Sequence, residues 1–415
     1  MGTPDDSASA NSVRQGVGVS VAAVPGRAVQ TVASVLVVAA WQTAASLCYY
    51  SVFAATAFVR TGFDLSRALV GLFLTAATLG YTLNLFPSGA AVDGLGERSV
   101  MVAALLALAT GAILVTAAPT YPLLLVAGGL LGAAYAPAMP ASNKGIVSAA
   151  PRGRENLAMG IKQVGVTAGS GAASVVVTGV AALAFWRAGF WTVAAIAVAY
   201  AAAFALLYDG SGGERRFEWP DLSGPADDRA YLLLVAAGLF VGATIYTMLG
   251  YVILYVEDVV GAGAAVGGVV LALTQVTGSA GRVGAGSLAD RLGGPRGAAT
   301  VAFAQVAAAA LIFAALSVGV ATVSGAAVAF VGLGATVLGS TGVYYSCLSE
   351  LVDPDDVGAA SAGGQTAINV GGLAVPPLFG HLADSATYGH GWVVLAALAG
   401  AGAVLLWVVR REVGR

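Results

Sequence analysis

Two cations lie inside long apolar stretches of the chain, where formal charge is rare. Lys162 lies a few residues into one stretch, and Arg282 lies eight residues before Asp290, near the end of another. With a rise of about 1.5 Å per helical residue, each lies roughly 8–10 Å inside its helix end. A two-pronged guanidinium with an ammonium suits a carboxylate or a similar oxyanion. The alternative is that both side chains extend to the membrane surface or pair with Asp290 and Asp93.

A short pattern occurs twice, each time at the end of an apolar stretch. The copies are Gly89-Ala-Ala-Val-Asp93-Gly-Leu-Gly96-Glu-Arg98 and Gly286-Ser-Leu-Ala-Asp290-Arg291-Leu-Gly293-Gly-Pro-Arg296. The two Asp residues are 197 positions apart, nearly half of the 415 residues. The repeat therefore predicts a duplicated chain whose halves carry the same hinge at the same place.

The composition is that of a membrane protein. Hydrophobic residues make up 58% of the chain and charged residues 10%, whereas soluble domains have roughly 25% charged residues. So little charge cannot cover a surface in water, and the sequence has no basic patch for nucleic acid. Cys48 and Cys347 are expected to be small buried hydrophobes.

Stretches long enough to cross a bilayer as helices occur in two sets of six. They lie at about 31–59, 68–88, 99–118, 122–141, 157–181 and 190–208, then at 230–256, 265–289, 298–317, 323–345, 358–380 and 392–410. We expect two pseudo-symmetric six-helix bundles, 31–208 and 230–410, joined by a cytoplasmic linker, 209–229. Residues 1–29 are polar and are expected to form a disordered cytoplasmic tail.

The basic residues set the orientation of this all-α membrane protein. With the N-terminus inside, 16 of the 19 Lys and Arg residues lie at the cytoplasmic side. Arg60, Arg67 and Arg187 lie outside. This asymmetry predicts twelve transmembrane helices with both termini in the cytoplasm.

Over about 31–410 the chain resembles a major facilitator superfamily (MFS) transporter. The resemblance rests on the two Gly-x3-Asp-x2-Gly repeats, on Trp186-Arg187-Ala-Gly-Phe190, and on the stretch from Pro151 to Gly169 that contains Gly160-Ile-Lys162-Gln163-Val-Gly165. Gly94 departs from the family pattern, in which a basic residue commonly follows the Asp, so we expect a reduced salt-bridge network there.

The resemblance implies a gating role for the repeats. Asp93 is expected to lie near the start of the eleventh helix and Asp290 near the start of the fifth, where carboxylates accept hydrogen bonds from free helix amides. Gly89 and Gly286 allow close helix approach. The expected gating residues, which close the cytoplasmic side, are Asp93, Arg98, Asp290 and Arg291.

The resemblance also implies a cavity between the halves. It brings the fifth and eighth helices together, so Lys162 and Arg282 become near neighbours. The predicted substrate-binding residues are Lys162, Arg282, Gln163, Tyr50, Tyr246, Gln275, Tyr344, Gln365 and Asn369. Further polar residues on the same cavity-lining helices are Gln42, Tyr49, Tyr135, Thr247, Tyr251 and Tyr345.

Acidic side chains are absent from the middle of the apolar stretches. All 21 Asp and Glu residues fall in tails, loops or helix ends. A proton relay inside a membrane usually contains such a carboxylate. The pattern disfavours proton-coupled efflux of cations and favours uniport, exchange, or symport in which an anion carries the proton.

The expected function is secondary transport of a small anion by alternating access. The Lys162 stretch is similar to those of organic-anion and inorganic-anion permeases of the superfamily, and a carboxylate is the favoured substrate. An exporter of hydrophobic, drug-like compounds is the alternative within transport, and a non-transporting membrane sensor or assembly protein is the alternative of another class.

We expect a monomer in the plasma membrane of a prokaryote, with a small-molecule substrate and a coupling ion as its partners besides the bilayer. No enzymatic activity, cofactor or metal is expected. His381 and His390 are expected to be residues of the outer loop between the last two helices, because two His nine apart make a poor metal site.

Overall fold

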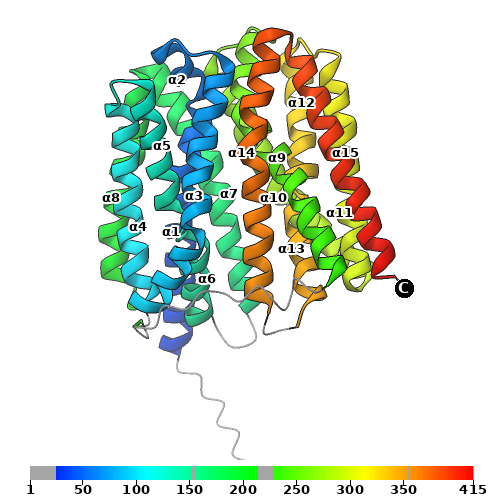
Figure 1. The fold of residues 1–415 in the computed structure, drawn as a ribbon. Coiled ribbons are helices and arrows are strands. Elements are labelled where there is room, and N and C mark those ends of the chain that lie inside the picture. Colours follow the sequence, from blue (N-terminus) through cyan, green and yellow to red (C-terminus); the bar gives the residue numbers. More distant parts are fainter. Residues whose placement is uncertain (1–24, 151–154, 211, 214–227, 354–355, 415) are drawn as a thin grey trace, which may run out of the picture.

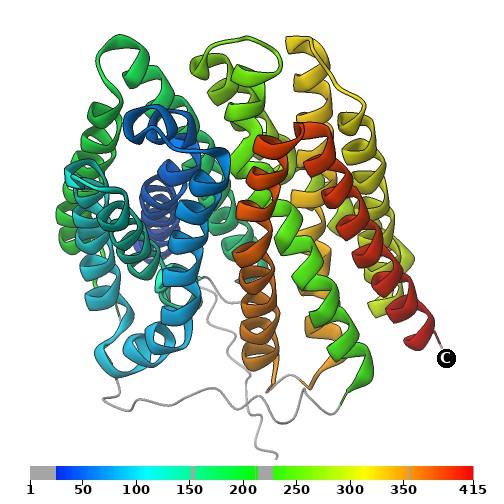
Figure 2. The ribbon, with the colours of Figure 1, turned by 45° about the horizontal axis from the view of Figure 1, so that its top comes forward.

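The protein is a bundle of long helices whose first and second halves lie side by side (Figures 1 and 2). The computed structural model describes residues 25–150, 155–210, 212–213, 228–353 and 356–414, and for 25–31 and 155–157 only the backbone. Most of the predicted tail 1–29 and linker 209–229 lies outside the described residues. We call the end of the bundle that carries α2 the upper end, and the end at which α15 finishes the lower end, as drawn in Figure 1.

The first half contains eight helices. They are α1 (Pro25–Ala54), α2 (Thr56–Phe63), α3 (Arg67–Leu95), α4 (Glu97–Ala117), α5 (Tyr121–Tyr135), α6 (Ala138–Ala149), α7 (Glu155–Leu183) and α8 (Trp186–Leu207). α5 and α6 are separated at Pro137, which has no amide hydrogen to continue the helical bonding.

The second half contains seven α-helices and one π-helical turn. They are α9 (Arg229–Asp258), α10 (Ala264–Leu292), α11 (Gly294–Ser317), α12 (Val323–Leu333), η2 (Gly334–Leu338), α13 (Ser340–Leu351), α14 (Val357–Ser385) and α15 (Tyr388–Glu412). In η2 the amide of Gly339 donates to the carbonyl of Gly334 at 3.0 Å, five residues back. π-helical turns inside α-helices are frequent at functional sites.

Eleven helical stretches, each of 21 to 30 residues, are long and apolar enough to cross a membrane. They include α5–α6 and α12–α13 as single stretches. α14, which coincides with the predicted stretch 358–380, is not among the eleven, although it packs between α3 and α9. The described residues thus form the expected all-helical membrane protein, with eleven of the twelve predicted crossings meeting this measure.

The helices are longer than the apolar stretches that predicted them. α3 continues to Leu95, and α14 continues to Ser385. His381 and His390 therefore lie in α14 and α15, and the expectation that they belong to a loop was wrong. Hydropathy marks only the apolar part of a helix, whereas its polar ends stay helical because the backbone bonds continue there.

The two halves touch closely at the upper end. A Cβ atom placed on Gly71 of α3 would lie 2.5 Å from the backbone of Pro376 in α14. Thr75 Oγ1 donates to the carbonyl oxygen of Leu373 at 2.6 Å across the same contact. Glycine permits this approach because it has no side chain.

At the lower end the glycines of the two repeats make no close contact with a neighbouring helix in the described part of the chain. A Cβ atom on Gly89 or Gly286 would meet no described atom within 4 Å. The expectation that these two glycines allow a neighbouring helix to approach is wrong for this conformation. In the described part of the chain the close contact between α3 and α14 is made one helix length away, at Gly71.

Gly71→Ala is expected to separate the upper ends of α3 and α14. The new methyl group overlaps the Pro376 backbone, and overpacking of this kind costs about 1–3 kcal/mol. Spin labels at Thr61 and Ala265, on a background lacking Cys48 and Cys347, would report a longer distance between the upper ends. Gly89→Ala is the matched control in the same helix and should leave the distance unchanged. An unchanged distance in Gly71→Ala would contradict this account of the contact.

Candidate functional site

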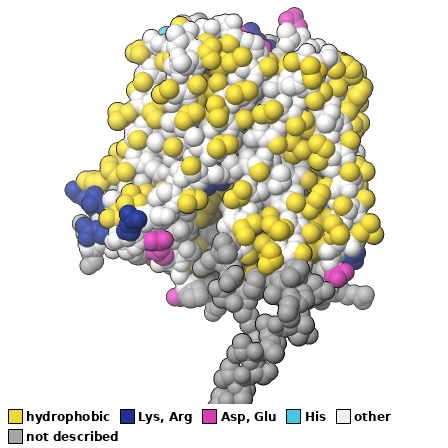
Figure 3. Space-filling view, turned by 180° about the vertical axis from the view of Figure 1, so that it is seen from behind, with side chains coloured by type: hydrophobic (Ala, Val, Ile, Leu, Met, Phe, Trp, Pro, Cys, Tyr) yellow, Lys and Arg dark blue, Asp and Glu magenta, His cyan; other side chains and the backbone are white. Residues whose placement is uncertain are grey.

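A cavity lies between the two halves and is lined by both. It has a solvent-accessible volume of about 130 Å³. Its lining comprises Tyr50, Tyr81, Tyr135, Met139, Gln163, Val166, Thr167, Ser170, Ile245, Tyr246, Leu249, Gln275, Arg282, Leu338, Thr341, Gly342, Tyr345, Gln365 and Ile368. Figure 3 shows a hollow in the lower half of the molecule, between surfaces rich in apolar side chains.

Arg282 is the one formally charged residue in this lining. Its Nε donates to the carbonyl oxygen of Leu338 at 3.2 Å and to Thr341 Oγ1 at 2.9 Å. The Leu338 carbonyl belongs to the π-helical turn η2, so the irregular turn helps to hold the guanidinium. Within the described residues no carboxylate forms an ion pair with Arg282. The remaining guanidinium nitrogens are therefore available to an anion in the cavity.

The first half contributes a wall of packed tyrosines. The ring of Tyr135 stacks on that of Tyr49, with centroids 4.4 Å apart and planes 3° apart. Tyr50 and Tyr81 meet Tyr135 edge to face. The Tyr135 hydroxyl shares a hydrogen bond of 3.0 Å with Ser46 Oγ. Stacking and this bond hold the rings against one another, so the wall presents a continuous aromatic surface to the cavity.

In the second half a buried amide organises the polar groups. Asn369 Oδ1 accepts from Tyr246 Oη at 2.8 Å and from Gln365 Nε2 at 2.8 Å. Tyr345 Oη donates to Gln365 Oε1 at 2.6 Å. Asn369 is fully buried and does not line the cavity, so it acts by positioning Tyr246 and Gln365.

Lys162 does not share the cavity with Arg282. It is fully buried in the first half, where its Nζ donates to Asn143 Oδ1 at 2.8 Å and contacts Met139 Sδ at 3.4 Å. α7 and α10 do pack against each other, as the resemblance implied, but the lysine points toward α6. The expectation of two cations facing one anion is corrected: Arg282 lines the cavity, and Lys162 lies behind Met139.

The nine predicted substrate-binding residues fall into two groups, those that line the cavity and those that do not. Six of the nine line the cavity, namely Arg282, Gln163, Tyr50, Tyr246, Gln275 and Gln365. Tyr344 is buried against Gly238 and Gly364, and its neighbour Tyr345 faces the cavity instead. Lining residues that the sequence did not single out include Tyr81, Met139, Thr167, Ser170 and Thr341.

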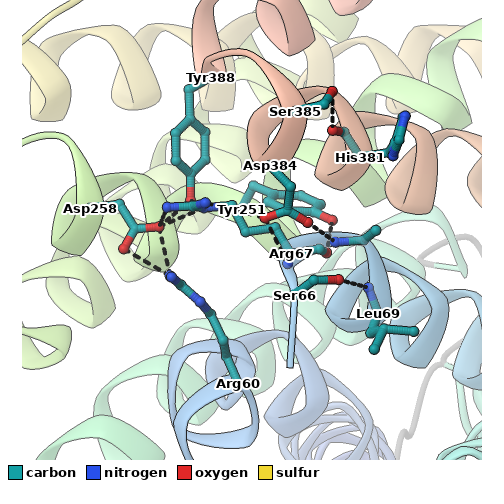
Figure 4. A network of polar contacts seen from close by, with 11 residues as sticks. Arg60, Ser66, Arg67, Leu69, Tyr251, Asp258, His381, Asp384, Ser385 and Tyr388 are labelled. Carbon is teal, nitrogen blue, oxygen red and sulfur yellow. Dashed lines mark hydrogen bonds and ion pairs between the residues drawn. The ribbon is translucent and has the colours of Figure 1, made fainter. Parts of the chain in front are cut away.

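A network of ion pairs joins the halves at the upper end (Figure 4). Asp258 of α9 accepts from Arg60 at 2.7 Å, from Arg67 at 2.8 Å and from the Tyr388 hydroxyl at 2.7 Å. The Arg67 guanidinium also lies 5.1 Å from the Tyr388 ring centroid. Because Arg60 and Arg67 belong to the first half and their partners to the second, these contacts hold the upper end closed. We call this network the upper gate.

Asp384 completes the upper gate by capping a helix. It accepts from the backbone amides of Arg67 at 3.1 Å and Ala68 at 3.0 Å, in the first turn of α3. Gly380 lies four residues before it, and a Cβ atom there would lie against the Arg67 carbonyl. Gly380-x3-Asp384 thus has the Gly-to-Asp spacing of the two repeats, with Thr387 in place of their second Gly, and this partial copy was the signal that could have located the upper gate.

At the lower end the predicted gating residues are apart from their expected partners. Asp93 pairs with Lys144 of α6 at 3.0 Å, not with the start of α14. Arg98 donates to the carbonyl oxygen of Ala205. Asp290 and Arg291 are exposed, and their side chains form no hydrogen bond or ion pair with the rest of the described chain.

Comparison with known proteins gives a family match. Residues 35–361 match the model of the Major Facilitator Superfamily. No curated protein sequence matches the chain.

Solved structures show the same fold. A bacterial homologue of the human lysosomal transporter Spinster, inward-facing and unoccupied, is similar with a TM-score of 0.75 and 15% identity, over 94% of this chain and 98% of its own. Its inward-facing, occupied form gives a TM-score of 0.72 over the same shares at 15% identity. A mutant of the nucleoside transporter NupG has a TM-score of 0.75 and 12% identity, over 91% of this chain and 99% of its own.

Proposed function

This chain belongs to the major facilitator superfamily, and from that premise we propose that it is a secondary transporter of a small organic anion, a carboxylate. The observation that carries the proposal is Arg282. Its guanidinium lines a cavity between the halves without a carboxylate partner among the described residues. Arg282 is partly buried, and a cation left unpaired in such a site is unfavourable. A substrate carboxylate supplies the missing charge through charge-assisted bonds.

The two ends of the bundle support alternating access. The upper gate closes one end, while at the other Gly89 and Gly286 make no close contact with a neighbouring helix among the described residues. We take the lower end to be cytoplasmic and α14 to be the twelfth crossing. The described basic residues in the lower ends of the helices outnumber Arg60, Arg67 and Arg187 at the other end; they are Arg98, Lys144, Arg229, Arg291, Arg296, Arg410 and Arg411. In the opposite conformation Asp93 and Asp290 would reach the starts of α14 and α7, and the upper gate would open.

Uptake into proteoliposomes tests this function. The purified protein is first screened by thermal unfolding against acetate, benzoate, succinate, nitrate and the cationic dye ethidium, because a ligand stabilises the state that it binds. The radiolabelled form of the best anion is then measured in counterflow, which a transporter of that anion supports. Movement of ethidium alone would favour an exporter of drug-like compounds, and no movement of any solute would favour a membrane sensor.

Two adjacent residues of α7 give a sharper prediction. Gln163→Ala should weaken binding of the carboxylate about 10- to 150-fold, because a hydrogen bond to a charged group is lost. Lys162→Met should leave binding close to that of the parent, because this side chain faces Asn143. Calorimetric titration with the anion chosen above measures both. Strong loss of binding in a folded Lys162→Met, with Gln163→Ala unaffected, would reverse these assignments.

A further inference from the structure

We propose that the substrate is an aromatic monocarboxylate, whose carboxylate binds Arg282 and whose ring packs against the tyrosines of the cavity. This inference rests on the proposed function and adds the chemical class of the solute. It follows from the way in which the charge and the aromatic surface are divided within one cavity.

The charged pole lies on the lower side of the cavity. Gly171 of α7 approaches Gln275 of α10, where a Cβ atom would lie 3.9 Å from the Gln275 Cβ. Gln163 lies eight residues below Gly171, and Arg282 lies seven residues below Gln275, because the two helices run in opposite directions. These separations are about 12 Å and 10 Å, so Gln163 and Arg282 lie at one level on facing helices.

Both groups at this level have unused hydrogen-bonding capacity. Gln163 Oε1 is buried without a hydrogen-bond partner in the described protein. Only Nε of Arg282 has partners there, which are Leu338 and Thr341. An anion between them would accept from the guanidinium and from the Gln163 amide, whose oxygen and nitrogen positions exchange by a simple flip.

The aromatic pole consists of four tyrosines that line the same cavity. Tyr50, Tyr81 and Tyr135 form the wall of the first half, and Tyr246 faces them from the second. Tyr345 lies lower, three residues beyond Gly342, which packs against Arg282. Tyr50 is only partly buried, so its ring has surface free for a ligand. Aromatic side chains favour edge-to-face or offset contact with another ring, which a flat substrate ring can provide.

The composition of the lining argues against other solutes. One guanidinium and no carboxylate line the cavity, so a monoanion is balanced, whereas a dianion keeps one charge unpaired and a cation is repelled. A small inorganic anion or acetate would neutralise Arg282 but leave the tyrosine surfaces and Ile245, Leu249 and Ile368 uncovered. A single ring covers that surface, and removal of apolar area from water favours binding.

Binding of four probes to the purified full-length protein tests the inference. Calorimetric titration compares benzoate, cyclohexanecarboxylate, acetate and benzamide. We expect benzoate to bind at least tenfold more tightly than acetate and several-fold more tightly than cyclohexanecarboxylate, and benzamide not to bind. Equal affinity for benzoate and acetate, or for benzoate and cyclohexanecarboxylate, would overturn the aromatic class while the carboxylate transporter stands. Tight binding of benzamide, or no binding of any carboxylate, would overturn the proposed function itself.

Variants of one tyrosine separate ring contact from loss of folding. Tyr50→Leu should weaken benzoate binding about tenfold and leave acetate binding unchanged, whereas Tyr50→Phe should retain benzoate binding. Tyr121→Leu, at the upper end of α5 and outside the cavity, is the matched control and should bind both anions as the parent does. If Tyr50→Leu fails to fold, Tyr81→Leu takes its place with the same expected result. Unchanged benzoate affinity in the folded leucine variant would contradict the proposal.

Discussion

Arg282→Ala should reduce carboxylate binding by about 30-fold to several thousandfold, and transport should be lost with it. Truncating one partner of a buried, hydrogen-bonded charge pair costs about 2–5 kcal/mol, which corresponds to this range of affinity. Arg282 is the one formal charge in the cavity lining, so no neighbouring cation can replace it there. Calorimetric titration of the folded variant with benzoate measures the loss.

Arg282→Lys should fall between the parent and Arg282→Ala. The ammonium keeps the charge, but it cannot contact Leu338, Thr341 and a carboxylate with the planar geometry of a guanidinium. Arg296→Ala, which removes an exposed cation at the start of α11, is the matched control for charge and should bind benzoate normally. Parental affinity in a folded Arg282→Ala would remove the observation on which the anion proposal rests.

The sequence predicted the fold well because its signals are long and redundant. Each membrane helix needs about 20 apolar residues, and such stretches are plain in a chain with 10% charge. α14 is the instructive exception, since it carries polar groups such as Gln365 and Asn369 that serve the cavity. A helix that lines a site loses part of the apolar signal that reveals a membrane crossing.

The site was only partly predictable, because successive side chains along an α-helix point in directions about 100° apart. Lys162 and Gln163 are neighbours in sequence, yet Gln163 lines the cavity and Lys162 faces Asn143. Tyr344 and Tyr345 divide in the same way. The depth of a residue along its helix can be counted from the sequence. Which face of the helix points into the cavity depends on packing with helices that are distant in the chain.

The upper gate shows a different limit of prediction from sequence. The sequence led us to expect a glycine for close approach and a carboxylate at a helix start, and this arrangement exists at Gly380, Asp384 and the start of α3. We assigned it to the lower end from the two repeats that match the family pattern. The sequence is the same in every conformation, so it does not show which of several equivalent contacts is formed in a given state.

Asp258→Asn should open the upper end. Asp258 accepts hydrogen bonds from Arg60, Arg67 and Tyr388. A neutral amide would leave Arg60 without an ion-pair partner among the described residues, next to the Arg67 guanidinium, which keeps its pair with Asp384 at 3.2 Å. A hydrogen bond to a charged group contributes about 1.5–3 kcal/mol. The side chains of Asp258 and Arg67 are 18% and 22% exposed, so solvent screens part of this. A net loss of about 1–3 kcal/mol would shift the ratio of closed to open upper ends about 5- to 150-fold.

Distances between spin labels at Thr61 and Ala265 would measure this shift directly, independently of any substrate. Asp64→Asn is the matched control, because Asp64 is an exposed carboxylate at the same end and asparagine tolerates its backbone φ of 51°. Its distance distribution should equal that of the parent, whereas Asp258→Asn should add a longer component that grows at low salt, where repulsion between the two arginines is least screened. A single short distance in both variants would mean that close packing at Gly71 and Gly380, and not charge, holds the upper end closed.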